Sequence, residues 1–239
     1  MRVDIVIPAF NEVDRIEPTL KSYAKAMMGH DALFVVVDDG SSDATGSKVS
    51  SLMDSLPFPV RLIRSPVNEG KGAALHRGLL FSRPDAERTF IADADGATPA
   101  SEFEILLAEA EAGADLVMAS RGLGTEKVRQ HWLRRGMGRT FNRLIRMALP
   151  AGFTDTQCGF KVFSPKAVTA ILSKASLPGF AYDVEWIMIC LRHGLVVREV
   201  AVTWNHVEAS RVHIIKDSAR MLRDLLRIRF RDRGGGYAS

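Results

Sequence analysis

The sequence predicts an α/β fold with a mostly parallel central sheet and helices on both faces. Three observations lead to this prediction: short apolar runs alternate with helical patterns, 46% of the 239 residues are hydrophobic, and only 10 are proline. A chain of this length and composition can bury one substantial core. The alternation favours parallel pairing, because parallel strands need crossover connections that are usually helical.

The first half of the chain carries this alternation in order. Residues 3–8 are an apolar run that ends in a proline, which predicts a buried strand, and residues 33–37 repeat the pattern before a polar loop. The expected strands are residues 3–8, 33–37, 60–63, 88–92 and 115–119, and the expected helices between them are residues 13–28, 44–56, 72–82 and 102–112.

The regular alternation stops after residue 119. Residues 127–148 predict a basic helical region that bears Trp132 and Phe141. The other expected elements are helices at 165–173, 184–192 and 214–230, and a strand at 196–202. Because no internal repeat or domain boundary is visible, we expect one domain over residues 1–233. Residues 234–239, which begin with three glycines, are expected to be a flexible tail.

The net charge of +4 is unevenly distributed. Residues 121–149 carry a net charge of +7 and residues 211–233 a net charge of +5, which leaves −8 for the rest. An acidic body with two basic segments indicates a localised anionic partner, such as phosphates or a lipid surface, and no nucleic acid partner. The alternative is that both segments are solvated helix faces.

The sequence also bears on location. It has no apolar run of the roughly 18 to 20 residues that a transmembrane helix needs, and its polar start leads directly into a strand pattern rather than a signal peptide. We therefore expect a cytoplasmic protein. Cys158 and Cys190 are far apart in dissimilar contexts, which indicates reduced thiols rather than a disulfide or a zinc site.

Three polar loops follow expected strands. They contain Asn11 with Glu12, Asp38 with Asp39, and Asp93 with Asp95. The carboxyl ends of parallel strands meet at one edge of a sheet, where ligands of such folds bind. Mg²⁺ and Mn²⁺ prefer oxygen ligands, and are usually held by one or two carboxylates and substrate phosphates. The pair Asp93 and Asp95 therefore predicts a metal site for a diphosphate; the alternative is an ordinary turn.

No glycine-rich phosphate loop of the standard kinds is present, which argues against NTPases and dinucleotide oxidoreductases. The segment 68–72, NEGKG, still brings backbone amides and the ammonium of Lys71 together. It is either a nucleotide-binding loop or a tight turn that caps the next helix.

Several of these motifs together resemble a known family. PAFNE at 8–12, VDDGSSD at 37–43, NEGKG at 68–72 and DADG at 93–96 resemble, in this order, the motifs of family-two inverting glycosyltransferases. DTQCGFK at 155–161, FAYDVE at 180–185 and EVAVTW at 199–204 resemble the dolichyl-phosphate glucosyltransferase branch, with dolichyl-phosphate mannose synthases as close relatives. The resemblance runs from about residue 3 to residue 230.

The resemblance implies a GT-A fold and assigns roles by motif. The residues that would line the nucleoside pocket are Pro8, Phe10, Glu12 and Asp39, with Asp38 beside them. Asp93 and Asp95 would hold Mg²⁺ or Mn²⁺ on the diphosphate, with Asp95 as the direct ligand. Asp155 and Glu185 would face the sugar and acceptor.

Two arginines are further candidates for binding phosphate. Arg121 follows the strand at 115–119 and is placed to meet phosphate charge; the alternative is a surface arginine. Arg211 is a candidate ligand of the acceptor phosphate. A lipid monophosphate is already ionised at neutral pH and needs no general base, so Asp155 would orient the sugar or acceptor rather than take a proton. Its motif is otherwise a structural turn.

The expected activity is transfer of a hexose, glucose from UDP-glucose, to a polyprenyl (dolichyl or undecaprenyl) phosphate with inversion. The basic amphipathic segments would lie peripherally on the cytoplasmic face of a membrane, or pack on the core or on a second subunit of a homodimer. Alternatives are GDP-mannose as donor, a soluble or protein acceptor, a non-catalytic binding protein, and a nucleotidyltransferase.

Overall fold

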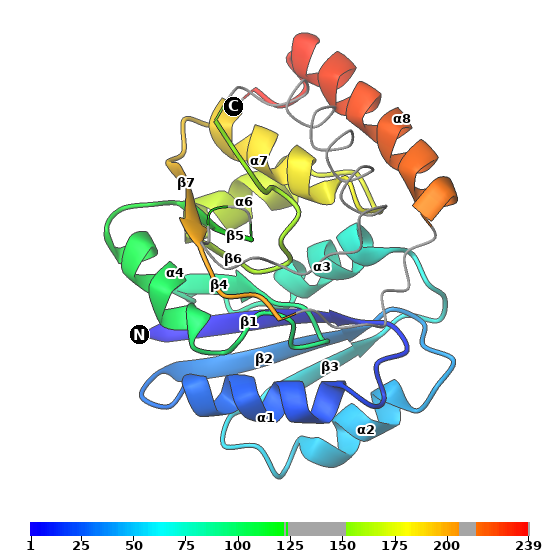
Figure 1. Ribbon diagram of the computed structural model, residues 1–239, viewed down its shortest axis with the longest axis vertical. Helices are drawn as coiled ribbons and strands as arrows, with labels where there is room; N and C mark the ends of the chain where they lie inside the picture. Colours follow the sequence, from blue (N-terminus) through cyan, green and yellow to red (C-terminus); the bar gives the residue numbers. More distant parts are fainter. Residues whose placement is uncertain (122, 124–151, 206–213, 239) are drawn as a thin grey trace.

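In the residues that the structure describes, seven strands form one sheet in the order β3-β2-β1-β4-β6-β5-β7 (Figure 1). The computed structural model describes residues 1–121, 123, 152–205 and 214–238. The strands are β1 (Arg2–Ala9), β2 (Asp31–Asp38), β3 (Val60–Arg64), β4 (Arg88–Ile91), β5 (Leu116–Ser120), β6 (Lys161–Phe163) and β7 (Val197–Ala201). All neighbours pair in parallel except β6, which runs antiparallel to both β4 and β5.

Helices cover both faces of this sheet (Figure 1). They are α1 (Ile16–Ala26), α2 (Thr45–Leu52), α3 (Lys71–Leu80), α4 (Glu102–Glu111), α6 (Pro165–Lys174), α7 (Tyr182–Arg192) and α8 (Ile214–Arg233). The predicted α/β class and mostly parallel sheet are confirmed. Strand β6 was not predicted, because three residues are too few to show a periodic pattern.

The alternation of side chains along β1 divides the core into two layers. Val3, Ile5 and Ile7 pack with apolar residues of α1, α2 and α4 on one face of the sheet. Val6 points to the other face and joins a second layer with residues of α3, α6 and α7. Successive side chains of a strand point to opposite faces, so a strand covered on both sides is apolar along most of its length.

Helix α8 lies outside α7 (Figure 1) and contributes Met221, Leu225 and Ile228 to the second layer. In the part of the chain that the structure describes, no helix is long and apolar enough to cross a membrane. The basic helical region predicted for residues 127–148 lies outside the described residues.

The described residues after α8, which belong to the expected tail, form a turn. Gly234, Gly235 and Gly236 donate backbone hydrogen bonds to carbonyls in the last turn of α8, and the chain turns back toward α7 (Figure 1). Tyr237 is 1% exposed and belongs to the second core layer. The glycines thus form a tight turn that returns one aromatic ring to the core.

Candidate active site

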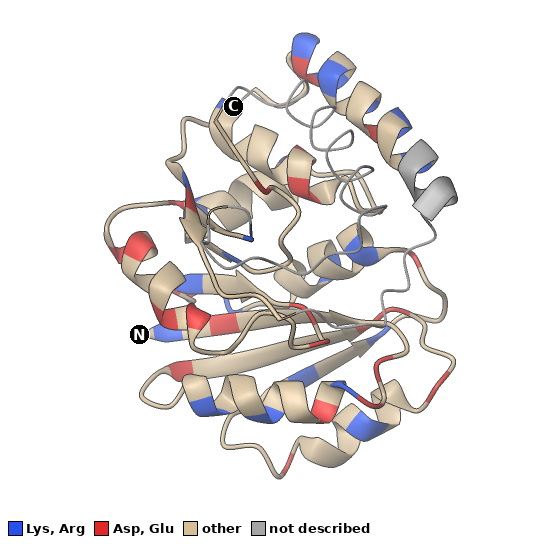
Figure 2. Ribbon diagram, viewed as in Figure 1, with Lys and Arg blue, Asp and Glu red and all other residues tan. Residues whose placement is uncertain are grey.

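Among the described residues, the predicted site residues other than Glu185 lie around the carboxyl ends of β1, β2, β4 and β5, where Figure 2 shows acidic residues in the loops that leave β1 and β2. Pro8 is the penultimate residue of β1 and Asp38 is the last residue of β2. Asp93 follows β4, and Arg121 follows β5 directly. The parallel arrangement brings these four ends to one edge of the sheet, as expected.

A single asparagine ties the first two loops together. Asn11 has a left-handed backbone with φ 56°, which asparagine tolerates better than most residues. Its side-chain oxygen accepts hydrogen bonds from the backbone N–H groups of Ser42 (2.8 Å) and Asp43 (3.2 Å). The loop after β1 is therefore fixed to the loop after β2 without a ligand.

The carboxylates of these loops already have partners. The two oxygens of Asp39 accept the backbone N–H groups of Glu69 (3.0 Å) and Gly70 (2.8 Å), and burial raises the pKa of Asp39. Glu12 forms an ion pair with Arg15 at 2.6 Å. Both residues therefore shape the loops of the predicted nucleoside pocket.

The other predicted nucleoside residues differ in exposure. Asp38 is buried at the end of β2 and accepts the backbone N–H of Ser41 at 3.0 Å, which makes a tight local turn. Pro8 is partly buried, whereas Phe10 is 37% exposed and offers an open aromatic surface at this edge.

Lys71 and Asp93 form the charged centre of the site. Lys71 is the first residue of α3, and its Nζ lies 2.6 Å from Oδ1 of Asp93. Burial alone would raise the pKa of Asp93, but the nearby ammonium outweighs this effect and holds the pKa below its usual value. The ammonium of Lys71, at the start of α3, therefore keeps Asp93 ionised.

Asp95 lies in a different electrostatic environment. Burial, and next the negative charge of Asp93, raise the pKa of Asp95, and its Oδ1 accepts the backbone N–H of Ala97 at 3.0 Å. The negative charges of these two neighbouring carboxylates repel each other. Their oxygens are ligands that suit a hard divalent cation. Asp93 and Asp95 thus fit the predicted metal, although no group of three or more acidic, His or Cys side chains gathers around one point among the described residues.

Asp95 also lines an open cleft of about 250 Å³ between the DADG loop and the start of α1. Asp14, Arg15 and Thr19 form its other wall. None of the other predicted site residues that the structure describes lines this cleft.

Arg121 and Asp155 form a second ion pair. The guanidinium donates from Nε to Oδ2 (2.6 Å) and from a terminal nitrogen to Oδ1 (2.9 Å), and the backbone N–H of Arg121 donates to Oδ2 (3.1 Å). The guanidinium also lies 5.7 Å from the centre of the Trp204 ring. Burial would raise the pKa of Asp155, but Arg121 outweighs it and lowers the pKa.

The reversed direction of β6 explains why Asp155 reaches this edge. An antiparallel strand starts at the edge where its parallel neighbours end. Residues 155–160 precede β6 and so lie beside the ends of β4 and β5. Gly159 illustrates how close they are, because a Cβ on this glycine would overlap the carboxylate of Asp93.

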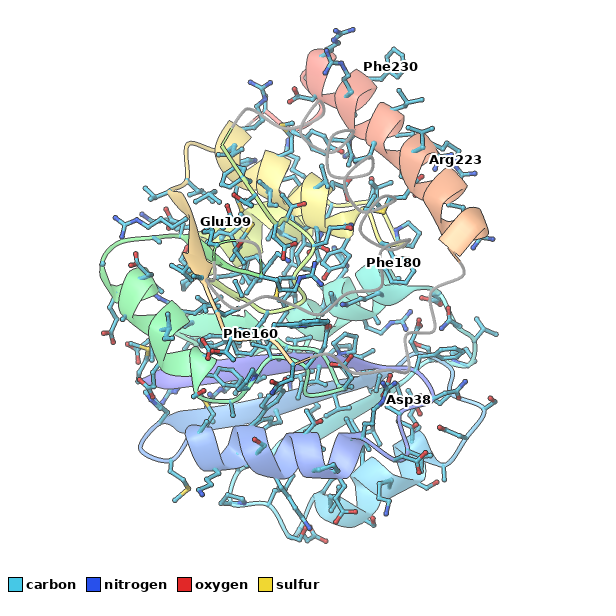
Figure 3. All side chains as sticks on the ribbon, in the orientation of Figure 1. Asp38, Phe160, Phe180, Glu199, Arg223 and Phe230 are labelled. Atoms are coloured by element: carbon cyan, nitrogen blue, oxygen red, sulfur yellow. The ribbon has the colours of Figure 1, made fainter. Side chains whose placement is uncertain are left out.

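Glu199 of β7 holds the segment before β6 and is labelled in Figure 3. Its carboxylate accepts the backbone N–H groups of Thr154 (2.8 Å) and Asp155 (2.6 Å). Glu199 belongs to the EVAVTW motif at 199–204, but the sequence alone gave no reason to assign it a role.

Lys161 and Asp183 form a buried pair that the sequence reasoning also missed. Nζ of Lys161 lies 2.5 Å from Oδ1 of Asp183, and both side chains are almost completely buried. Lys161 contributes to lowering the pKa values of both Asp93 and Asp155, so its buried positive charge acts on both carboxylates of the site. Each residue lies within a family-like motif, which was the available signal.

The structure does not bring Glu185 to the site in its predicted catalytic role. Its side chain is fully buried in α7, and its carboxylate accepts hydrogen bonds from Ser176, Leu177 and Tyr237. A carboxylate surrounded by protein donors has no oxygen directed at a sugar. Arg211, the candidate ligand of the acceptor phosphate, lies outside the described residues.

The mixed α/β sheet, with acidic loops and the carboxylates of Asp93 and Asp95 at its carboxyl edge, has the features expected of a glycosyltransferase of the GT-A type. Residues 4–172 match the family described as Glycosyl transferase family 2. The chain belongs to this family.

Named relatives and solved structures agree with this assignment. The chain is 34% identical to dolichyl-phosphate beta-glucosyltransferase ALG5C of Trichomonas vaginalis over 96% of its own length and 71% of the relative's. It is 30% identical to the human dolichyl-phosphate beta-glucosyltransferase over 99% of its own length and 77% of the relative's.

A solved structure similar in fold is glucosyl-3-phosphoglycerate synthase from Mycobacterium tuberculosis in complex with phosphoglyceric acid. Its TM-score is 0.71 at 19% identity, over 95% of this chain and 79% of that one. A structure of the same enzyme with Mn²⁺, UDP and phosphoglyceric acid gives a TM-score of 0.70 at 18% identity, over 98% and 78% of the two chains. At this identity the likeness concerns the fold.

Proposed function

We propose that the protein transfers glucose from UDP-glucose to a polyprenyl phosphate, such as dolichyl phosphate, with inversion at the anomeric carbon. The named relatives with 30–34% identity support the sugar and the lipid acceptor. In this reaction an acceptor phosphate oxygen bonds to the anomeric carbon, while the bond from that carbon to the donor diphosphate breaks and the nucleoside diphosphate leaves.

The observation that carries the phosphate acceptor is the Arg121–Asp155 ion pair. A hydroxyl acceptor needs a general base whose pKa lies near the working pH. Both oxygens of Asp155 are bonded to Arg121, and its pKa is lowered, so this carboxylate is a poor base. A phosphate is already ionised and needs only to be oriented, a role that Arg121 and Asp155 suit.

Asp93, Asp95 and Lys71 are the residues proposed to hold the donor diphosphate and its metal. When bound, a divalent cation supplies positive charge that stabilises the departing diphosphate. The Lys71 ammonium lies 2.6 Å from Asp93 and can move a short distance to meet a phosphate oxygen. Solved structures of a protein of similar fold contain Mn²⁺ or Mg²⁺ together with UDP, which supports a divalent metal in general.

We further propose that α8 docks the protein on an anionic membrane surface. Leu222 (42% exposed), Leu226 (51%) and Phe230 (71%) are four residues apart and therefore share one outward stripe of the helix. Figure 3 shows Phe230 and Arg223 pointing away from the protein body. The exposed arginines beside this stripe are Arg220, Arg223, Arg227, Arg229 and Arg233.

This pattern is typical of a helix in the membrane interface, where the apolar stripe enters the acyl boundary and the arginines meet lipid phosphates. Met221, Leu225 and Ile228 of the same helix are buried on α7, so the outward stripe is not needed for the core. The proposed location is the cytoplasmic face of a membrane, with peripheral attachment.

The reaction is tested with purified protein, Mg²⁺ or Mn²⁺, radiolabelled UDP-glucose and polyprenyl phosphate in detergent. We expect metal-dependent transfer of label into the lipid phase, release of UDP, and loss of transfer in Asp95→Ala. A panel with GDP-mannose and other nucleotide sugars identifies the donor, and the anomeric proton coupling of the product reports inversion. Donor binding with labelling only of a soluble acceptor would refute the lipid acceptor, and release of pyrophosphate would indicate a nucleotidyltransferase.

A further inference from the structure

Glu185 is surrounded by hydrogen-bond donors from two separate segments of the chain. Its Oε2 accepts the backbone N–H groups of Ser176 (3.0 Å) and Leu177 (2.9 Å). Its Oε1 accepts the hydroxyl of Ser176 (2.8 Å) and the hydroxyl of Tyr237 (3.0 Å). A fully buried carboxylate is stable only with such a set of donors, so these bonds hold their segments firmly to α7.

The first of these segments, residues 176–179, touches the start of α3. The carbonyl of Pro178 accepts the backbone N–H of Ala73 at 3.1 Å. A Cβ added to Gly70 would lie 2.6 Å from the Pro178 carbonyl oxygen, and one added to Gly72 would lie 2.5 Å from that of Leu177. This loop therefore fixes the backbone on both sides of Lys71.

The second segment is the turn after α8. Tyr237 reaches Glu185 from the C-terminal side, and Arg231 lies over the Tyr237 ring at 4.8 Å. A terminal nitrogen of Arg231 donates to the hydroxyl of Ser176 at 2.6 Å. The end of the chain thus supplies one of the hydrogen-bond donors of Glu185.

We infer that Glu185 and Tyr237 are positioning residues that set Lys71 against the donor diphosphate by holding the 176–179 loop on the first turn of α3. The path is a continuous set of contacts from Tyr237 to Glu185, from Glu185 to Leu177, and from Pro178 to Ala73. Lys71 is the first residue of that turn, and its ammonium is 2.6 Å from Asp93. This inference rests on the proposed function, in which Lys71 meets the diphosphate.

Tyr237→Phe tests the inference with a small change, because it removes one hydroxyl and keeps the buried ring. Without that donor, Glu185 holds the loop less firmly. We expect amide hydrogen exchange in residues 70–76 of the ligand-free protein to become about 3- to 10-fold faster, the effect of one hydrogen bond. We expect binding of UDP with Mn²⁺, measured by calorimetry, to weaken by a similar factor.

A double-mutant cycle separates positioning from general stability. With Lys71→Met as background, Tyr237→Phe should cause no further loss of UDP binding, because the group that it positions is gone. Ser173→Ala is the matched control: it removes a hydroxyl bonded to the Ala170 carbonyl in the neighbouring α6, and should change neither exchange at 70–76 nor UDP binding.

The outcomes are distinct. Unchanged exchange at 70–76 in Tyr237→Phe, or an equal loss of UDP binding on Tyr237→Phe in the wild-type and Lys71→Met backgrounds, overturns the inference. If wild-type protein does not bind UDP with metal, the proposed function fails, whereas the exchange experiment still tests the contact path. If Tyr237→Phe does not fold, Ser176→Ala removes a different donor of Glu185 and must give the same pattern.

Discussion

Arg121 holds the carboxylate of Asp155 with two side-chain hydrogen bonds and one from its own backbone, at 2.6, 2.9 and 3.1 Å. The pair joins the residue that follows β5 to the segment that precedes β6. It is thus both a structural link between two strands and, in the proposed reaction, the part of the site that orients ionised groups.

Asp155→Asn is expected to lower the free energy of unfolding at pH 7 by about 1 to 3 kcal/mol, because a partly buried guanidinium loses its acceptor. The folded pKa of Asp155 is lowered, so its contribution to stability is present above the unfolded pKa and is lost as pH falls through the folded pKa. The difference between wild type and Asp155→Asn should therefore shrink below the usual aspartate range. Urea unfolding at a series of pH values checks this, with the exposed Asp54→Asn as control. Equal stability of wild type and variant at pH 7 would contradict it.

Gly159→Ala should impair activity much more than stability. The new Cβ would overlap the carboxylate of Asp93, which would move away from the proposed metal and diphosphate. A displacement of about 1 Å in a catalytic group can reduce the rate by about 10²-fold. Transfer assays and thermal unfolding measure the two effects. The control is Gly234→Ala, where the nearest atoms lie at an ordinary 3.6 Å; similar activity in both variants would show that Asp93 has room to adjust.

Removing one charge of the Lys161–Asp183 pair should lower the unfolding free energy more than removing both charges together. Asp183→Asn leaves a buried ammonium without its counter-charge, which costs about 3 to 5 kcal/mol of unfolding free energy. The double variant Lys161→Met with Asp183→Leu removes both charges and should be more stable than Asp183→Asn. Chemical unfolding of the wild type, Asp183→Asn and the double variant measures this, and a double variant less stable than Asp183→Asn would count against it.

The outward face of α8 should bind anionic lipid. Leu226→Ser and Phe230→Ser are each expected to weaken binding to vesicles that contain anionic lipid by roughly tenfold, since each removes an apolar side chain that would enter the interface. Added salt should weaken binding by the wild type, because it screens the arginines. Sedimentation with vesicles checks both effects. Ile105→Ser changes an apolar residue on α4 that is 44% exposed and should have no effect; equal losses in all three variants would argue against a specific face.

The strands and helices that the sequence predicted are those with strong periodicity. The run at residues 3–8 alternates between two apolar faces, and its strand extends by only a residue at each end. Loops that follow parallel strands must converge, so the grouping of Asp93 with Arg121 at one edge was also predictable. These features depend on local pattern and on general rules of topology.

The contacts that decide roles were not predictable in the same way. The local sequence around Glu185 does not show whether its side chain faces a sugar or a loop. Only the packing of α7 against residues 176–177 and Tyr237 shows that it faces the loop. A similar limit applies to Glu199, whose bonds to Thr154 and Asp155 span more than forty residues. Three consecutive glycines favour flexibility by composition, yet here they form a turn because an aromatic residue follows them.

The place of β6 in the sheet has a consequence for how the protein folds. In the described part of the chain, the strands β3, β2, β1 and β4 on one side and β5 and β7 on the other are joined in the ladder only through β6, which is three residues long. Asp93 belongs to the first half and Arg121 to the second, so neither half alone contains the site. Contacts between the strands on the two sides of β6 are distant in sequence and are expected to form late in folding. The enzyme is therefore expected to acquire its active site in the folding step that completes its sheet.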